Sequence, residues 1–224
     1  FNTKLYTGTA STNAITGVGF QPDLTWIKVR TSSYSVVDDA VRGAGNVLNT
    51  ERTAAEQSST DFFDSFDTDG FTLGAGLGGT GSSNDSSSSY VSWNWLAGGG
   101  AGSSNTDGGT NTTSTSVNTT GGFSISTLPS YSGNTTFGHG LSAAPTLVIM
   151  KAMSGIDQWT VGHSGLGSWG KGLPLNTTEV EQTNSTFFND LAPDATIVNL
   201  GAWDAGYTRV AYCFHEVEGY SKFG

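Results

Sequence analysis

Hydrophobic and polar residues alternate along much of the chain, in short runs of the kind that form β-strands. In the segment 91–95, a valine and two tryptophans occupy every second position, and a serine and an asparagine lie between them. The segment 210–214 repeats this arrangement with valine, tyrosine and phenylalanine. A period of two is typical of a half-buried strand. The segments 24–29 and 147–150 are more continuously apolar, as in strands that are covered on both faces.

These short strands are separated by turn residues, and glycine alone contributes 32 of the 224 positions. Only residues 53–57 resemble a helix, and they would form about one turn. Many short strands with glycine-rich turns favour a sandwich. The sequence therefore predicts an all-β protein made of two tandem related β-sandwich units, of the jelly-roll or concanavalin-like type.

The expectation of two units comes from an internal repeat. Residues 22–28 and 145–151 share proline, leucine and lysine at the same places. Further matches follow in the same order: 6–8 with 131–133, 48–50 with 175–177, 62–63 with 187–188, 71–74 with 198–201, and 91–95 with 210–214. Six matches in register indicate a duplicated unit of roughly 100 residues, a common domain size.

Between the two halves lies an interval rich in glycine, serine and threonine, residues 97–121. Its composition is typical of a flexible or extended linker. We therefore predict a first β-sandwich repeat over 1–96, a linker over 97–121, and a second repeat over 122–224. A second polar patch, residues 77–89, is expected to be a long surface loop.

The charge of the chain excludes several classes of partner. Nineteen acidic and nine basic residues give a formal net charge of −10. A nucleic-acid-binding protein needs a basic footprint, and an anionic membrane surface attracts basic segments. No apolar stretch approaches the roughly 18 residues that cross a bilayer. We therefore expect that the protein neither binds nucleic acid nor inserts into a membrane. The chain begins at Phe1, which suggests a processed product or an excerpt of a longer protein.

Residues with catalytic or metal-binding chemistry are present without a recognisable arrangement. Several acidic pairs could be matched to the two carboxylates of a glycosidase, but none is set apart, so no catalytic residue is predicted. The histidines do not follow a zinc-ligand spacing, and Cys213 is the single cysteine, so no metal site or cofactor is predicted. The pair Asp67 and Asp69 resembles the opening of a calcium loop but lacks the closing glutamate; a turn is favoured, and a structural calcium ion stays open.

The six tryptophans fall into two sets. Those in strand patterns, Trp26, Trp93 and Trp95, are expected in the core or on a sheet face. The other three, Trp159, Trp169 and Trp203, lie near glycine-rich loops, where an exposed indole can stack on a sugar ring. These three residues are the candidate carbohydrate- or partner-binding residues.

Several longer strings together carry a resemblance to a known family. They are residues 4–8, 15–28, 67–74, 90–95 and 216–224, the last reading EVEGYSKFG. The chain resembles, over nearly its whole length outside the predicted linker, a repeat domain of tailed-bacteriophage virion structural proteins of marine or cyanobacterial type. Many members of that group are tail-fibre or receptor-binding components.

The resemblance implies a non-enzymatic virion structural protein, a tail-fibre, receptor-binding or capsid-surface component located in the extracellular particle. It implies partners as well: copies of the same chain in a symmetric oligomer, other virion proteins and host surface glycans, where many copies compensate for weak single sites. It supplies no catalytic residues. Two alternatives stay open, a lectin-like carbohydrate-binding module and a glycan depolymerase, which would need a cleft with paired carboxylates.

Overall fold

A computed structural model describes residues 1–31, 35–76 and 83–224, apart from the side chain of Asp204. The protein is all-β, as the alternating pattern predicts: the described residues form 18 strands and three short 3-10 turns. No helix in these residues has the length and hydrophobicity needed to cross a membrane. In the stretch 53–57, which resembles a helix in the sequence, residues 53–56 are irregular and Gln57 begins a short strand, which corrects that expectation.

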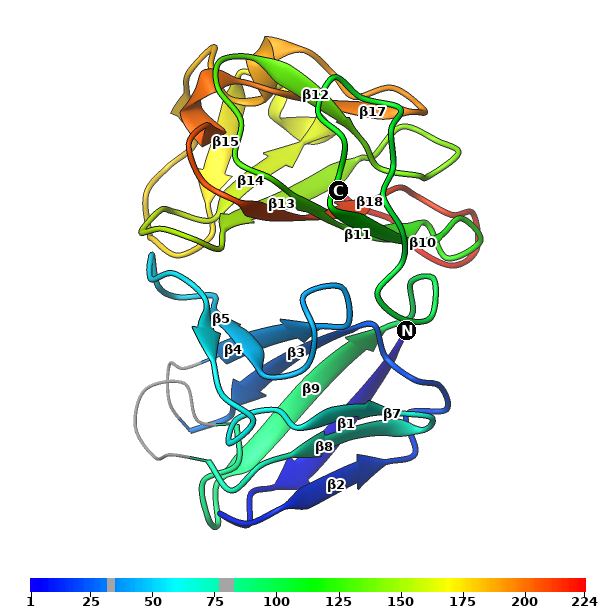
Figure 1. The fold of residues 1–224 in the computed structure, drawn as a ribbon, viewed down its shortest axis with the longest axis vertical. Helices are drawn as coiled ribbons and strands as arrows, with labels where there is room; N and C mark the ends of the chain where they lie inside the picture. The colour runs from blue at the N-terminus through cyan, green and yellow to red at the C-terminus, as the bar shows by residue number, and fades with distance from the viewer. Residues whose placement is uncertain (32–34, 77–82) are drawn as a thin grey trace. The chain divides into compact units, whose positions relative to one another are not determined.

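The chain divides into two compact units, Phe1–Gly100 (unit 1) and Ala101–Gly224 (unit 2). Each unit contains a large antiparallel sheet and a smaller one (Figure 1). Apolar side chains from the large sheet meet those of the small sheet to form a core in each unit. Two sheets packed over a shared core make a β-sandwich, the arrangement predicted for both halves.

Unit 1 has a six-stranded sheet in the order β1-β9-β3-β4-β5-β6 and a three-stranded sheet in the order β2-β8-β7. The strands are β1 (Asn2–Thr7), β2 (Asn13–Thr16), β3 (Leu24–Val29), β4 (Ser35–Asp39), β5 (Asn46–Asn49), β6 (Gln57–Ser58), β7 (Ser65–Asp67), β8 (Gly70–Leu73) and β9 (Ser89–Trp95). Every second residue of β3 points inward, so Ile27 and Val29 enter the core together with Phe63 and Phe71. The two phenylalanine rings stack at 5.4 Å.

Unit 2 has a seven-stranded sheet in the order β10-β11-β18-β13-β14-β15-β16 and a two-stranded sheet, β12-β17. The elements are β10 (Ser114–Asn118), β11 (Phe123–Leu128), β12 (Thr135–Gly138), β13 (Leu147–Ala152), β14 (Thr160–His163), η1 (Ser164–Leu166), β15 (Lys171–Pro174), β16 (Gln182–Thr183), η2 (Phe188–Asp190), β17 (Ile197–Leu200), η3 (Ala202–Asp204) and β18 (Arg209–Phe214). Its core includes Val148 and Met150 of β13, Phe137 of β12, and Leu200 of β17.

The two units share one order of strands. The series β1-β9-β3-β4-β5-β6 corresponds to β11-β18-β13-β14-β15-β16, and β2-β8 corresponds to β12-β17. A shared order is what a duplicated unit predicts. One sequence match needs adjustment: β1 pairs Tyr6 with Tyr90, and β11 pairs Leu128 with Arg209. Tyr6 therefore corresponds to Leu128, whereas the sequence comparison matched it with Tyr131.

The interval 97–121 differs from the predicted linker because most of it belongs to the two sandwiches. Its first residues close unit 1, where the buried Asp23 carboxylate accepts hydrogen bonds from three backbone amides, those of Ala97 (2.7 Å), Gly99 (2.9 Å) and Gly100 (2.6 Å). Its last part contains β10, which pairs with β11 along five residues. Threonine and serine occur in β-strands as well as in loops, so composition alone did not distinguish a strand from a linker.

The second polar patch, residues 77–89, lies partly outside the described residues. Residues 77–82 belong to that part. The remainder includes Ser83 and Asn84, both of which are buried. The Asn84 side chain bonds with Thr9, Ser11, Asn13 and Gly74 and so joins three segments of unit 1.

Candidate carbohydrate-binding surface in unit 2

The three candidate tryptophans occupy different environments. Trp159 and Trp169 are buried, with 1% and 7% of their surface exposed, whereas Trp203 is 44% exposed. Trp159 stacks on Tyr212, and the Trp169 ring meets Phe188 edge to face at 5.3 Å. A buried indole cannot receive a sugar ring. The structure therefore corrects the expectation for Trp159 and Trp169 and leaves Trp203 as the exposed candidate.

Trp203 is held in place by its neighbours in the loop between β17 and β18. Its ring packs edge to face on the buried Phe187 ring, at a centroid distance of 5.3 Å and an interplanar angle of 76°. The preceding amide, that of Ala202, donates a hydrogen bond of 3.0 Å to Asn134 Oδ1 in the loop before β12. The indole is thus supported from one side and linked to a second loop through its backbone.

A second feature of this region is a left-handed backbone turn at η2. Phe188, Asn189 and Asp190 have φ angles of 45°, 54° and 49°. Residues other than glycine seldom adopt positive φ, and each such residue costs on the order of 1–3 kcal/mol. The neighbouring structure maintains the turn. The Phe188 ring lies in the core against Trp169, and Asp190 Oδ1 accepts the amide of Gly170 at 2.7 Å and the hydroxyl of Ser168.

This turn presents Asn189 to solvent in a defined orientation. Asn134 Oδ1 accepts the Ala202 amide, so its nitrogen faces Asn189 and donates to Asn189 Oδ1 at 2.6 Å. The Asn189 amide nitrogen therefore points away from that bond. No described residue accepts a hydrogen bond from it, and Asn189 keeps part of its surface exposed.

We name the group Asn134, Asn189, Asp190 and Trp203 the Trp203 surface. It contains the supported indole of Trp203 and the Asn189 amide, whose N–H groups have no acceptor among the described residues. It also contains the Asp190 carboxylate, whose Oδ2 has no partner among the described residues. An aromatic ring offers its face to the C–H groups of a sugar, and the polar groups match sugar hydroxyls. The arrangement suits the binding of a carbohydrate.

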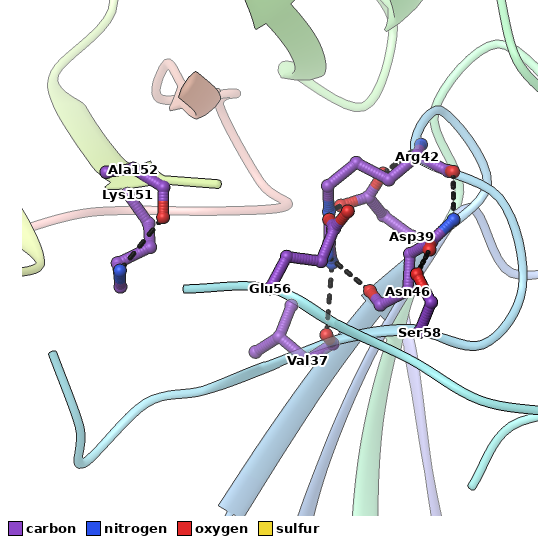
Figure 2. Close-up of polar contacts among 8 residues, drawn as sticks. All are labelled: Val37, Asp39, Arg42, Asn46, Glu56, Ser58, Lys151 and Ala152. Atoms are coloured by element: carbon purple, nitrogen blue, oxygen red, sulfur yellow. Dashed lines mark hydrogen bonds and ion pairs between the residues drawn. The ribbon is translucent and has the colours of Figure 1, made fainter. Parts of the chain in front are cut away.

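The acidic pair Asp38 and Asp39 has an unusual environment without forming a catalytic cleft. The two residues are consecutive in β4, so their side chains point to opposite faces of the sheet. The Asp39 carboxylate is bound by Arg42 Nε at 2.6 Å, and Arg42 also contacts Glu56 at 2.8 Å (Figure 2). Asp38 is 1% exposed, and burial raises its pKa to about 7. A polysaccharide cannot reach a carboxyl group so deeply enclosed.

Asp67 and Asp69 are engaged within the fold. Asp67 accepts hydroxyl hydrogen bonds from Ser65 and Thr72, while Asp69 accepts the amides of Gly17 and Gly19. These two amides lower the pKa of Asp69. The two carboxylates bond to different segments and do not converge on one point. The sequence Asp-x-Asp-Gly forms the hairpin turn between β7 and β8. Among the described residues, no three His, Cys, Asp or Glu side chains gather to hold a metal ion.

The histidines likewise serve the local structure. His139 is fully buried, its Nδ1 accepts the Leu141 amide at 3.1 Å, and its Nε2 lies 3.1 Å from the Asp194 carbonyl oxygen. The first bond requires an unprotonated Nδ1, so Nε2 carries the proton and donates it. Burial lowers the pKa of His139 and keeps the ring neutral. His163 Nδ1 accepts the Gly165 amide and caps η1.

Two further reactive side chains are enclosed in unit 2. Burial lowers the pKa of Lys151 to about 8, and its amine donates to the Ala152 carbonyl oxygen at 2.9 Å (Figure 2). Burial raises the pKa of the Cys213 thiol to about 12, so the thiolate is scarce at neutral pH. Both side chains are buried, so we interpret them as structural groups and not as nucleophiles.

Comparison with known families places the chain. Residues 1–224 match the family described as a domain of unknown function (DUF7483). The chain belongs to this family. Searches among curated proteins and among solved structures find no match.

Sequence reasoning found Trp203 and missed its companions. Asn134, Asn189 and Asp190 are ordinary residues in a chain rich in asparagine and aspartate, and only folding brings the first next to the others. One local signal was present: asparagine and aspartate tolerate the left-handed region better than most residues, and here they follow two phenylalanines. That pair can anchor a turn while the next two residues face solvent.

Proposed function

We propose that this protein is a non-catalytic adhesive module that binds neutral carbohydrate through the Trp203 surface. The observation that carries the proposal is the exposed, supported indole of Trp203, linked by the Ala202–Asn134–Asn189 hydrogen bonds to an amide with unused donors. A site of this kind orients a sugar by stacking and by a small number of placed polar groups.

The expected ligand is a neutral glycan because the charge of the protein opposes an anionic one. The chain carries a formal charge of −10, and Asp190 adds a carboxylate within the Trp203 surface itself. Sialylated, sulfated or phosphorylated glycans would meet repulsion that grows as the salt concentration falls. A neutral hexose polymer avoids that cost and offers both hydroxyl groups and an apolar ring face.

The setting that we propose for this activity is the surface of a bacteriophage particle, as tail-fibre, receptor-binding or capsid-surface component. The support is the sequence resemblance to virion repeat domains, together with two sandwich units of the same strand order. In that setting a single weak site is sufficient, since many copies of one particle engage a host surface together.

Replacing Trp203 by alanine is expected to abolish glycan binding without unfolding the protein. The side chain is 44% exposed, so its removal costs little core packing, while the sugar loses its stacking surface. We expect at least a tenfold loss of affinity, about 1.4 kcal/mol. The measurement is a glycan-array screen of the wild-type protein, followed by calorimetric titration of the best neutral ligand.

Tyr220→Ala is the matched control, because Tyr220 is an exposed aromatic residue of unit 2 outside the Trp203 surface. It is expected to bind like the wild-type protein. Equal affinity of the wild-type and Trp203→Ala proteins would refute the proposal. Release of new reducing ends from the bound glycan would instead establish the depolymerase alternative.

A further inference from the structure

One long edge of the large sheet in unit 1 has no partner strand. β1 is the outermost strand on that side, and it pairs with β9 along all six of its residues. Its side chains are exposed or half-buried, and Leu5 is 67% exposed. An exposed edge strand with an apolar side chain and no proline is a template for pairing with another chain.

In unit 2 the corresponding edge is occupied. β11 takes the place of β1, and β10 covers its free side in an antiparallel ladder from Ser114–Thr127 to Asn118–Phe123. The fold therefore accommodates a strand at this position. In unit 1 the same position, beside β1, holds no strand among the described residues.

The remaining edges of the two large sheets are protected differently. β6 and β16 contain two residues each, too few to seat a strand. β10 is partly covered by the bridge between Ser103 and Thr115 and by the hydrogen bond from Ser114 to Ala101. Among the described residues, β1 is thus the long edge of a large sheet that stays open.

The hydrogen-bonding groups of β1 alternate in direction. The Gly8 amide donates to the Ser88 carbonyl at 2.9 Å, and hydrogen-bonded pairs alternate along an antiparallel ladder. Lys4 and Tyr6 therefore bond to β9, while the backbone groups of Thr3, Leu5 and Thr7 face outward. The Thr3 amide accordingly donates to the Asn2 side chain. For Leu5, the central residue, no described residue pairs with the amide or the carbonyl group.

We propose that β1 of one copy pairs with β1 of a second copy, antiparallel, with Leu5 facing Leu5 across a twofold axis. Two large sheets then join into one continuous sheet that runs through both copies. The occupant is a second copy because the strand is complementary to itself in this register. Leu5 meets Leu5, Thr3 meets Thr7, and Lys4 meets Tyr6, so no like charges face each other.

This register also uses the available hydrogen bonds. Leu5 is an outward-facing residue, so two opposed copies exchange a pair of amide-to-carbonyl bonds at the axis. At the next pairs Thr3 and Thr7 of opposite copies face each other, and the Thr3 amide exchanges its bond to the Asn2 side chain for one to the Thr7 carbonyl group. The Thr7 carbonyl already accepts from Asn13 at 3.2 Å and has a second lone pair for the partner.

The contact is small, which sets the expected affinity. Stable interfaces bury about 1,600 Å², and two strands of six residues bury less. We therefore expect a weak dimer, with a dissociation constant on the order of 100 µM. This inference stands apart from the glycan-binding proposal, because it concerns unit 1 and needs no ligand.

Light scattering after size-exclusion chromatography tests the inference, with loading from about 10 µM to about 1 mM so as to span that constant. The weight-average mass of the wild-type protein is expected to rise from 23.2 kDa towards twice that value. Leu5→Lys and Leu5→Glu are each expected to stay monomeric, since like charges then meet at the axis. An equimolar mixture of the two variants should again form a dimer.

Val180→Lys is the matched control, because Val180 is 83% exposed and lies outside any strand. It should dimerise like the wild-type protein. A wild-type mass that stays at 23.2 kDa at the highest loading would overturn the inference. A dimer that Leu5→Lys leaves intact, or a trimer, would overturn it as well.

Discussion

Raising the pH from about 4 to about 8 is expected to lower the free energy of unfolding of unit 1 by up to about 4 kcal/mol through Asp38 alone. Burial raises the pKa of this carboxyl group from 3.8 to about 7. Between these values the unfolded chain releases the proton and the folded chain keeps it, so stability falls as the pH rises through this window and levels off above it. One pH unit corresponds to about 1.4 kcal/mol.

The groups around Asp38 act in both directions, and burial dominates. Asp39 and Glu56 disfavour its ionised form, while Arg42 and the Gly45 amide favour it. Neither carboxylate oxygen of Asp38 makes a hydrogen bond of normal geometry with another group. Tyr6 responds to the same site, because burial, and then Tyr90 and Asp38, hold its pKa above the usual range.

The matched variant is Asp38→Asn, which keeps the shape and removes the titration. We expect it to resemble the wild-type protein at pH 4 and to be more stable at pH 8, by as much as about 4 kcal/mol. Urea unfolding at several pH values, followed by hydrogen exchange of β3 and β4 amides, measures the difference. Parallel pH profiles for the two proteins would contradict this account of Asp38.

Replacing the next residue is expected to have the opposite effect. Asp39→Asn should lower the free energy of unfolding of unit 1 by about 3 kcal/mol at pH 7. The side chains of Asp39 and Arg42 are 0% and 1% exposed, and their ion pair is 2.6 Å long. Removing the carboxylate leaves a buried guanidinium group that keeps its ion pair with Glu56 and loses the one with residue 39.

The same urea series measures this variant, and the comparison is internal because the two aspartates are neighbours. Asp39→Asn should be less stable than the wild-type protein at pH 7, because the buried ion pair with Arg42 is lost. Asp39→Glu is the second variant, since it keeps the charge while changing the reach. A loss below about 1 kcal/mol for Asp39→Asn would mean that the pair behaves as an exposed one.

The alternation predicted where the strands lie, but it did not predict which face of each strand is buried. In β9 the intervening positions Tyr90, Ser92 and Asn94 are buried while the valine and the two tryptophans are half-buried, and in β18 all six residues are buried. β9 and β18, read from valine and aromatic residues at every second position, pair with their neighbours as expected of central strands. The linker was harder to read, since its role depends on distant partners. Nothing local in residues 97–100 shows that Asp23 will receive their amides.

The tryptophans show a similar limit. Trp169 lies beside glycines in the sequence, which suggests a surface loop, yet it is buried because β14 has a glycine beneath it. A Cβ atom at Gly162 would come within 2.8 Å of the Trp169 ring and 2.5 Å of Phe188. The strand registers make Gly162 in β14 of unit 2 equivalent to Asp38 in β4 of unit 1. At this equivalent position, unit 2 has a glycine covered by aromatic rings and unit 1 has a carboxyl group.

The left-handed turn at η2 was only partly visible in the sequence, for a related reason. The left-handed conformation of Phe188 follows from packing against Trp169 and from the bonds that Asp190 receives, which are contacts with residues about 20 positions away. Trp203 was identified by its residue type, and its neighbours Asn134 and Asn189 by the fold alone. The sequence therefore predicted the aromatic residue of the candidate site, and the structure was needed to find its polar residues.

The most direct test of the Trp203 surface is an NMR titration that observes the indole N–H signals of the six tryptophans. Trp203→Phe assigns its own signal by absence. On addition of the neutral oligosaccharide that the array selects, the Trp203 signal should shift most, while the buried Trp159 and Trp169 signals stay in place. Shifts at Trp26, Trp93 or Trp95 with an unchanged Trp203 signal would contradict the account and move the binding site to unit 1.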